Sequence, residues 1–253
     1  MCYTCSITDY FVDYVQILEE VSGDSYSLWN YDSIPGPEPH FLIRIVKLDF
    51  LDEIKEAMKV VGDRVKQRMV EFEETGKNEE TMFKELCFCI LTANYKAEGG
   101  IRIQKVIGDG FCSLEANELA MRLRGLGYRF PETRAKYITE SRRFRQKLTG
   151  ILQGFANEIE AREWLVENVK GLGYKEASHF LRNIGYDDVA IIDRHILRFL
   201  EEKQLIKEIP KTLNKTRYMA IETLLSVIAD RLDLTLGELD LYLWYMKTGK
   251  VLK

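Results

Sequence analysis

VKGLGYKEASHFLRNIG, at residues 169–185, is the stretch of the sequence that decides the fold. It joins the end of one amphipathic segment to the start of another through Gly171-Leu172-Gly173. A Gly-x-Gly turn lets the backbone reverse sharply, because glycine adopts conformations that other residues avoid. The N–H groups at the start of the second helix then point outward and can bind a phosphate. The stretch therefore predicts a helix–hairpin–helix unit with a site for an anion.

The same turn occurs twice. GLGY stands at residues 125–128 and again at residues 171–174. In both copies we expect one amphipathic helix to end at the turn and another to begin there. An ordinary αα-hairpin without a ligand is the alternative for either copy.

Apolar residues recur at helical spacing along nearly all of the chain after residue 48, and strand patterns are almost missing. The last segment starts at a capping box made by Thr235 and Glu238, and Gly249 suits its end. The fold class predicted is therefore all-α, with many short helices. The predicted helices cover residues 50–74, 79–93, 115–124, 133–148, 157–168, 175–184, 194–203, 212–231 and 236–247.

The first 48 residues have a different character. Three of the five prolines fall within residues 35–39, which indicates a turn or linker, and β-prone residues follow at 41–46. We predict an N-terminal extension at residues 1–48, with a short strand as one option, and a helical domain at residues 49–253.

Composition narrows the class of protein. The chain has 253 residues, of which 46% are hydrophobic and 30% charged, as in an ordinary globular protein. It has no run of about 18 apolar residues and no signal peptide, so we expect a cytoplasmic protein without membrane contact. Cys2 and Cys5 lack a second pair at zinc spacing, and Cys87 and Cys89 lie in an apolar run. We therefore predict buried thiols in that run and no metal site.

The charge distribution favours nucleic acid as a partner, although the net charge is −4. Residues 121–150 contain nine Lys or Arg and two acids, a local charge of +7. A positive face on an otherwise acidic protein suits an enzyme that binds DNA phosphates. A solvated helix face is the alternative for this basic stretch.

After the hairpin, Lys175 starts the next helix, and an apolar run at 189–192 leads to Asp193, eighteen residues further on. In these residues the chain resembles the helix–hairpin–helix DNA glycosylase superfamily. It is most similar to the short archaeal and bacterial 8-oxoguanine DNA glycosylase/AP lyases, and the resemblance covers residues 49–253. It implies a two-lobed helical fold with a DNA cleft between the lobes. It also implies that Lys175 is the nucleophile and that Asp193 assists it.

The residue types suit this chemistry. A neutral lysine amine can attack the sugar carbon C1′ and form a Schiff base, and a carboxylate can accept a proton or stabilise a cationic sugar. We expect an apolar wall and the helix start to disfavour the ammonium form of Lys175, and the apolar run to bury Asp193. Taken singly, Lys175 could be a solvated lysine and Asp193 a plain N-cap. His179 and His195 are interpreted as packing or surface residues.

The resemblance implies further roles. Asn94 would fill the gap left by a flipped-out base, with a helix C-cap as the alternative. Trp244 would stack on the extruded base, with plain core as the alternative, and Lys253 would help to distinguish the lesion. Phe130 is a candidate for the opposite face of the base. The hairpin residues expected to bind DNA are Gly171, Gly173 and Tyr174.

The predicted function is a bifunctional base-excision-repair enzyme that acts as a monomer without a cofactor. It would flip out and excise 8-oxoguanine from duplex DNA through a Schiff base on Lys175, and nick the abasic site by β-elimination. The alternatives are a glycosylase of the same fold for another oxidised base, and a non-catalytic helix–hairpin–helix module. The chain lacks the four cysteines that hold an iron–sulfur cluster near the C-terminus of some glycosylases. A structural cation on hairpin carbonyls around Val169 and Gly171 is compatible with the sequence.

Overall fold

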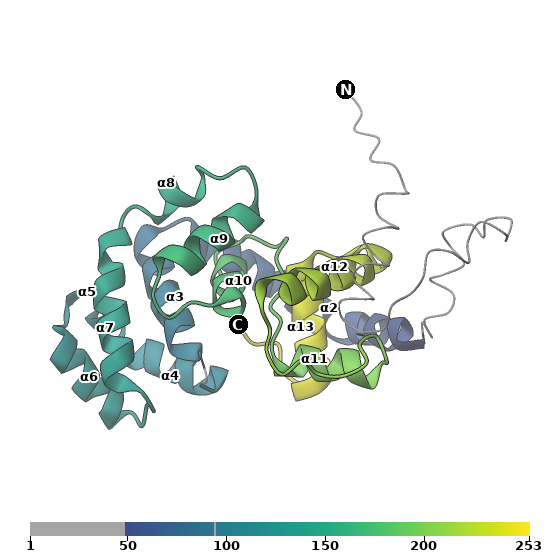
Figure 1. Cartoon of the computed structure of the whole chain (residues 1–253), viewed down its shortest axis with the longest axis horizontal. Coiled ribbons are helices and arrows are strands. Elements are labelled where there is room, and N and C mark those ends of the chain that lie inside the picture. Colours follow the sequence, from purple (N-terminus) through teal and green to yellow (C-terminus); the bar gives the residue numbers. More distant parts are fainter. Residues whose placement is uncertain (1–48, 94) are drawn as a thin grey trace, which may run out of the picture. The chain divides into compact units, whose positions relative to one another are not determined.

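The computed structural model describes residues 49–93 and 95–253, the side chain of Asp49 excepted. The extension predicted at 1–48, its optional strand and the role predicted for Asn94 lie outside these residues. Within the described ranges the regular secondary structure is helical, with no strand, which confirms the all-α prediction (Figure 1). None of the described helices is long and apolar enough to cross a membrane.

The helices are short, apart from the first described one. Their bounds are α2 Asp49–Gly76, α3 Glu79–Thr92, α4 Ala97–Ile107, α5 Gly110–Ser113, α6 Ala116–Gly125, α7 Pro131–Ser141, the 3₁₀ turn η3 Arg142–Phe144, α8 Leu148–Leu152, α9 Glu158–Asn168, α10 Tyr174–Arg182, α11 Arg194–Glu202, α12 Lys215–Leu232 and α13 Leu236–Thr248.

Side chains cap several helix starts by accepting hydrogen bonds from main-chain N–H groups that have no partner within the helix. Asn78 caps α3 in this way, and Asn157 caps α9. At α13 the predicted capping box between Thr235 and Glu238 is present, and Gly249 ends the helix with a φ of +71°. Both ends predicted for this helix are therefore confirmed.

One predicted helix is wrong in its extent. The segment 133–148 was expected to be continuous, but α7 ends at Ser141, and Gln146 has a φ of +65°. The Arg142 side chain turns back instead, donating to the carbonyls of Phe111 (2.9 Å) and Leu114 (2.5 Å). These bonds hold the C-terminal end of α7 against α5 and the residue that follows it. Tertiary contacts therefore override the helical sequence pattern here.

The helix α4 is missing from the sequence prediction because its segment contains Gly99 and Gly100, which disfavour a helix. The structure gives a reason for the second glycine. A Cβ at Gly100 would lie 3.0 Å from the ring of Phe88 on α3. Glycine thus allows α4 to approach α3 closely.

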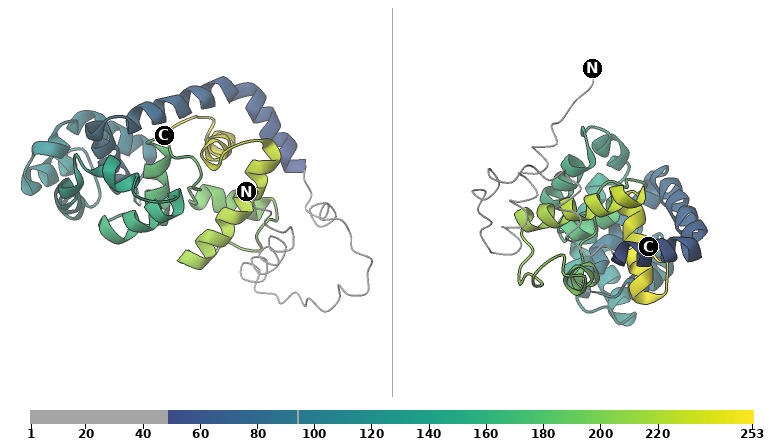
Figure 2. Two further views of the ribbon diagram at one scale, coloured as in Figure 1. Left: turned by 90° about the horizontal axis from the view of Figure 1, so that it is seen from above. Right: turned by 90° about the vertical axis from the view of Figure 1, so that its right-hand side faces the viewer.

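The chain divides into two compact units, in agreement with the two-lobed prediction. The larger contains residues 61–191 and 234–253, and the described part of the smaller contains residues 49–60 and 192–233. The helix α2, drawn in purple and blue in Figure 2, belongs to the smaller unit up to Val60 and to the larger from Val61.

In the larger unit the core is built around α3. This helix contacts α4, α5, α7, α8 and α10, and residues 86–91 have no solvent exposure. Cys87 and Cys89 lie in that run, and burial raises the pKa of both thiols well above the usual range. They are buried core thiols, as predicted.

In the smaller unit the buried apolar side chains come from α11, α12 and the start of α2. Phe50 packs edge-on against Phe199 with ring centroids 5.9 Å apart. The Tyr218 hydroxyl accepts a hydrogen bond from the main-chain N–H of Ile192 at 3.2 Å. That bond fixes the chain one residue before Asp193.

Candidate active site

The hairpin between α9 and α10 takes the tight turn that its glycines predict. Gly171 has a φ of +92°, and a Cβ there would come 2.7 Å from the Tyr137 ring, so a side chain would be both strained and obstructed. The other copy of the repeat is different. Gly127 has a φ of +77°, but α7 begins only at Pro131, so this copy ends a helix without directly opening the next.

Lys175 is the second residue of α10, with its side chain 29% exposed. Its Nζ lies 3.0 Å from Oε1 of Glu176, while Oε2 of the same carboxylate accepts from the Gly173 N–H at 3.2 Å. The Glu176 carboxylate is thus a charged neighbour of Lys175 that the sequence analysis did not include. Glu176 joins the hairpin to the lysine. The sequence signal for it was the spacing Gly173-x-x-Glu176, which matches only the Glu half of a capping box, because glycine has no side chain to cap the helix.

Tyr174 and His179 occupy the same helix. The Tyr174 hydroxyl donates to Glu163 of α9 at 2.8 Å and so ties the two helices of the hairpin together. His179 is buried, with its ring edge-on to Phe88 at 5.5 Å. Burial lowers the pKa of His179 well below its usual value, and the charges of Arg182, Lys175 and Lys253 lower it further. The imidazole is therefore neutral at neutral pH and packs in the core, as predicted.

Asp193 is the N-cap of α11. Its Oδ1 accepts from the N–H groups of His195 (2.7 Å) and Ile196 (3.0 Å), so one oxygen makes both capping bonds. Residues 189–192 are buried as expected, whereas Asp193 itself is partly exposed. Lys175 and Asp193 belong to different units, and the catalytic pairing of the two stays a prediction.

The connector from α10 to α11 is held by Glu158 at the start of α9. The Glu158 carboxylate accepts from the main-chain N–H groups of Asp187 (3.2 Å) and Asp188 (2.8 Å), and the Asp187 carbonyl accepts from Gly237 (2.8 Å). Burial raises the pKa of Glu158 from 4.5 to about 7 despite the two bonds, and the neighbouring aspartates raise it as well. Nothing in the sequence alone singled out this carboxylate.

Glu158 predicts a pH-dependent stability. Its pKa is raised in the folded state, so between about pH 4.5 and about pH 7 the folded chain binds more protons than the unfolded chain, and stability falls as pH rises through that window. Glu158→Gln removes this contribution to the pH dependence of stability. Relative to the parent, the unfolding free energy of the variant should rise by about 1–3 kcal/mol between about pH 5 and about pH 8. This range includes a reduction for solvent screening.

Thermal melts across this range measure the effect. Glu160→Gln is the control, because Glu160 is an exposed acid on the same helix that accepts from the Ala156 N–H at 3.1 Å. Parallel pH profiles for the parent and the Glu158 variant would contradict the assignment.

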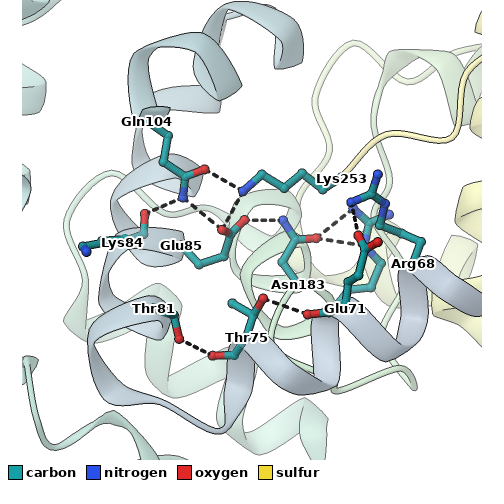
Figure 3. Close-up of polar contacts among 10 residues, drawn as sticks. Arg68, Glu71, Thr75, Thr81, Lys84, Glu85, Gln104, Asn183 and Lys253 are labelled. Atoms are coloured by element: carbon teal, nitrogen blue, oxygen red, sulfur yellow. Dashed lines mark hydrogen bonds and ion pairs between the residues drawn. The ribbon is translucent and has the colours of Figure 1, made fainter. Parts of the chain in front are cut away.

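Lys253 follows α13 and contacts α3 and α4 within the larger unit. Its Nζ donates to Glu85 Oε2 at 2.8 Å and to Gln104 Oε1 at 2.6 Å, as Figure 3 shows. The same ammonium lies 4.6 Å from the centre of the Phe88 ring. Sequence reasoning missed Glu85 and Gln104, which lie in α3 and in the unpredicted α4.

The two predicted base contacts come from different elements. Trp244 is a partly buried residue of α13. Phe130 lies directly before α7, is 40% exposed, and has the Arg129 guanidinium 5.0 Å from its ring centre. Their roles at a flipped base stay predictions.

Part of the basic stretch has structural partners. Arg142 binds main-chain carbonyls, Arg143 donates to the Asn168 carbonyl at the end of α9 (3.0 Å), and Arg134 donates to the Ala93 carbonyl (3.3 Å). Arg122 and Arg124 form ion pairs with nearby glutamates. Several of these arginines therefore have N–H donors occupied by protein groups, which leaves fewer donors for phosphates.

Comparison with known proteins identifies close relatives. The family model described as 8-oxoguanine DNA glycosylase matches residues 65–234. The 8-oxoguanine DNA glycosylase/AP lyase of Methanocaldococcus jannaschii is 56% identical over 204 residues, which are 80% of this chain and 97% of that protein. The protein of the same name from Korarchaeum cryptofilum is 52% identical over 206 residues, covering 80% of this chain and 98% of its own.

Solved structures agree with the sequence relatives. The M. jannaschii 8-oxoguanine glycosylase/lyase in complex with a 15mer DNA containing 8-oxoguanine superposes with a TM-score of 0.78 at 55% identity, covering 81% of this chain and 99% of that one. The 8-oxoguanine DNA glycosylase of Thermotoga maritima gives a TM-score of 0.77 at 46% identity, with 81% and 99% covered.

Proposed function

Because the chain belongs to the 8-oxoguanine DNA glycosylase family, we propose that Lys175 and Asp193 perform its base excision and strand cleavage. The chain is a DNA glycosylase with AP lyase activity, and its substrate is DNA containing 8-oxoguanine. The observation that supports the assignment of the nucleophile is the position of Lys175 in the first turn of α10, directly after the hairpin glycines.

The proposed reaction has two stages. In the first, the Lys175 amine forms a bond to C1′ as the bond from C1′ to the base breaks, and the base leaves with a proton. Asp193 stabilises the cationic sugar or accepts the proton of the attacking amine. In the second, the C1′–O4′ bond breaks and O4′ takes up a proton, which leaves a protonated Schiff base between Lys175 and C1′. This imine allows a C2′ proton to leave as the C3′–O bond breaks and the 3′ phosphate departs. Water then releases the lysine.

DNA binding is assigned to the hairpin and to the residues around the flipped base. Gly171, Gly173 and Tyr174 bring main-chain N–H groups to the start of α10, where a phosphate is favoured. The Gly173 N–H is already bonded to Glu176, so a phosphate there would be bound by other N–H groups of the turn or would displace that carboxylate. We also assign Asn94 to the gap that the flipped base leaves in the duplex. Trp244 and Phe130 are assigned to contacts with the extruded base. A structural cation would be bound by main-chain carbonyls of the hairpin.

The domain division, oligomeric state and compartment are also proposed. Residues 49–253 would form the catalytic domain and residues 1–48 an extension outside it. The relatives, which match about four-fifths of this chain while being almost fully covered themselves, support this division. We assign a monomer acting in the cytoplasm.

Borohydride trapping tests the mechanism. The full chain is incubated with an 8-oxoguanine duplex in the presence of borohydride, which reduces a lysine–sugar imine to a stable crosslink. We expect a crosslinked band with this duplex and none with the undamaged guanine duplex. A band formed only with an oxidised-pyrimidine duplex would assign the enzyme to another lesion. Strand cleavage without any trapped complex would exclude the lysine mechanism.

The proposed role of Lys253 in recognising the extruded base predicts a loss of activity that depends on the substrate. Removal of Lys253 should lower excision of 8-oxoguanine by about tenfold or more relative to cleavage at a preformed abasic site, because the abasic substrate has no base to recognise. Single-turnover rates on the two duplexes give the comparison. Equal losses on both duplexes would instead indicate a general defect in folding or DNA binding.

A further inference from the structure

The tail that follows α13 is fixed at several points within the larger unit. Gly249 turns the chain out of the helix, Lys250 forms an ion pair with Glu98 of α4, and Val251 is buried. The tail ends with Lys253, whose ammonium reaches Glu85 and Gln104 (Figure 3). The last residue is therefore held by its side chain, and the tail before it is held by Lys250 and Val251.

Glu85 is the centre of this arrangement. Its side chain is only 5% exposed, and both oxygens accept hydrogen bonds. Oε1 accepts from the Asn183 amide at 2.6 Å, and Oε2 accepts from Gln104 Nε2 at 3.0 Å as well as from Lys253. A buried carboxylate is costly unless a cation and hydrogen bonds compensate it. Lys253 supplies the positive charge.

A second cation, Arg182, lies nearby and is buried, but it has another partner. Arg182 forms an ion pair with Asp240 and donates to Asn183 Oδ1 at 3.1 Å and 2.9 Å. Asn183 therefore has its oxygen directed to Arg182 and its amide to Glu85. The Asn183 amide orientation is set by these two neighbours, and it leaves Glu85 Oε2 facing Lys253 and Gln104.

The position of the Lys253 ammonium follows from these contacts. An ammonium has three N–H donors, of which two point to Glu85 and Gln104. The Phe88 ring lies against the same group. At most one N–H is left for a ligand, so the protein, and not the ligand, determines where this side chain lies.

We infer that Glu85 and Gln104 are positioning residues for lesion recognition, acting by holding Lys253 in place. The inference rests on the proposed role of Lys253 at the extruded base. Glu85 contributes the charge and Gln104 the second acceptor. Loss of either releases the end of the tail, so selection of the oxidised base weakens while the lysine chemistry at Lys175 continues.

A double-mutant cycle tests this inference with Glu85→Gln, Lys253→Met and the double variant. Each is assayed for single-turnover excision of 8-oxoguanine and for cleavage of a preformed abasic duplex. Glu85→Gln should reduce excision by about tenfold more than abasic cleavage. In the Lys253→Met background the same substitution should add less than about twofold, because residues that act through one contact are not additive.

Two further variants keep the test independent of folding. Gln104→Met removes one acceptor of the ammonium and one hydrogen bond to Glu85 Oε2 but keeps the Glu85 charge, and it should shift the same ratio in the same direction. Glu79→Gln is the matched control, since Glu79 is also on α3 but accepts from the N–H groups of Leu148 (3.1 Å) and Thr149 (2.9 Å). It should leave the ratio unchanged.

The inference is overturned if Glu85→Gln and Gln104→Met lower both activities equally, or if the effects of Glu85→Gln and Lys253→Met multiply. The proposed function fails in a different way, by the absence of 8-oxoguanine excision and of borohydride trapping in the parent protein. The two failures are therefore distinguishable.

Discussion

Lys175→Gln will abolish the borohydride-trapped complex on an 8-oxoguanine duplex and will lower excision by about three or more orders of magnitude. Glutamine has a similar length but no amine, so it cannot form the imine on which both stages depend. The fold should persist. The side chain is partly exposed, and its ion pair with Glu176 is of a kind that contributes about 1 kcal/mol or less.

The matched control is Lys170→Gln in the same hairpin. Lys170 is 65% exposed and pairs with Glu140 at 3.0 Å, so its loss changes the local charge equally without removing the proposed nucleophile. We expect normal trapping in this variant, and near-normal duplex binding by both variants in a gel-shift assay. Full crosslinking by Lys175→Gln would move the nucleophile to another residue.

Local patterns allowed much of the fold to be predicted. The capping box at Thr235 and Glu238 and the glycine at Gly249 fix both ends of α13 through contacts between near neighbours in sequence. The turn at Gly171 was predictable for the same reason, because the conformation belongs to the residue itself. Such signals are visible in a single sequence.

Contacts between distant residues could not be predicted in the same way. Lys253 and Glu85 are 168 positions apart, and Glu85 on its own reads as one of many helical glutamates. The helix α4 was missed because its glycines serve packing against Phe88, and the break after Ser141 depends on carbonyls near α5 that bind Arg142. In each case tertiary packing outweighed local propensity.

Asp193 has a residue type that suits two roles, the N-cap of a helix and a catalytic carboxylate. The sequence left open a plain N-cap and a catalytic carboxylate, and the structure confirms the cap. Both capping bonds end on Oδ1, an atom that asparagine keeps. The cap therefore does not require the negative charge, and this separates the two roles experimentally.

Asp193→Asn should accordingly change the unfolding free energy by less than about 1 kcal/mol, because asparagine caps helices as well as aspartate does. Excision should fall by about two or more orders of magnitude, because the amide can neither accept a proton nor balance a cationic sugar. Thermal melts and single-turnover rates on the 8-oxoguanine duplex provide the two measurements. Asp193→Ala, which removes cap and charge together, should lose activity to a similar extent and stability by about 1 kcal/mol more.

Asn214→Ala supplies the opposite control in the same unit. It removes the cap of α12, where Asn214 accepts from the Arg217 N–H at 2.9 Å, and no reaction step is assigned to it. This variant should lose stability of about 1 kcal/mol and keep its excision rate. If Asp193→Asn keeps normal activity per folded molecule, and Asp193→Ala only loses stability as Asn214→Ala does, Asp193 is a capping residue only. If stability holds and excision is lost, the reaction requires the charge of the carboxylate, and the cap merely holds that carboxylate at the start of α11.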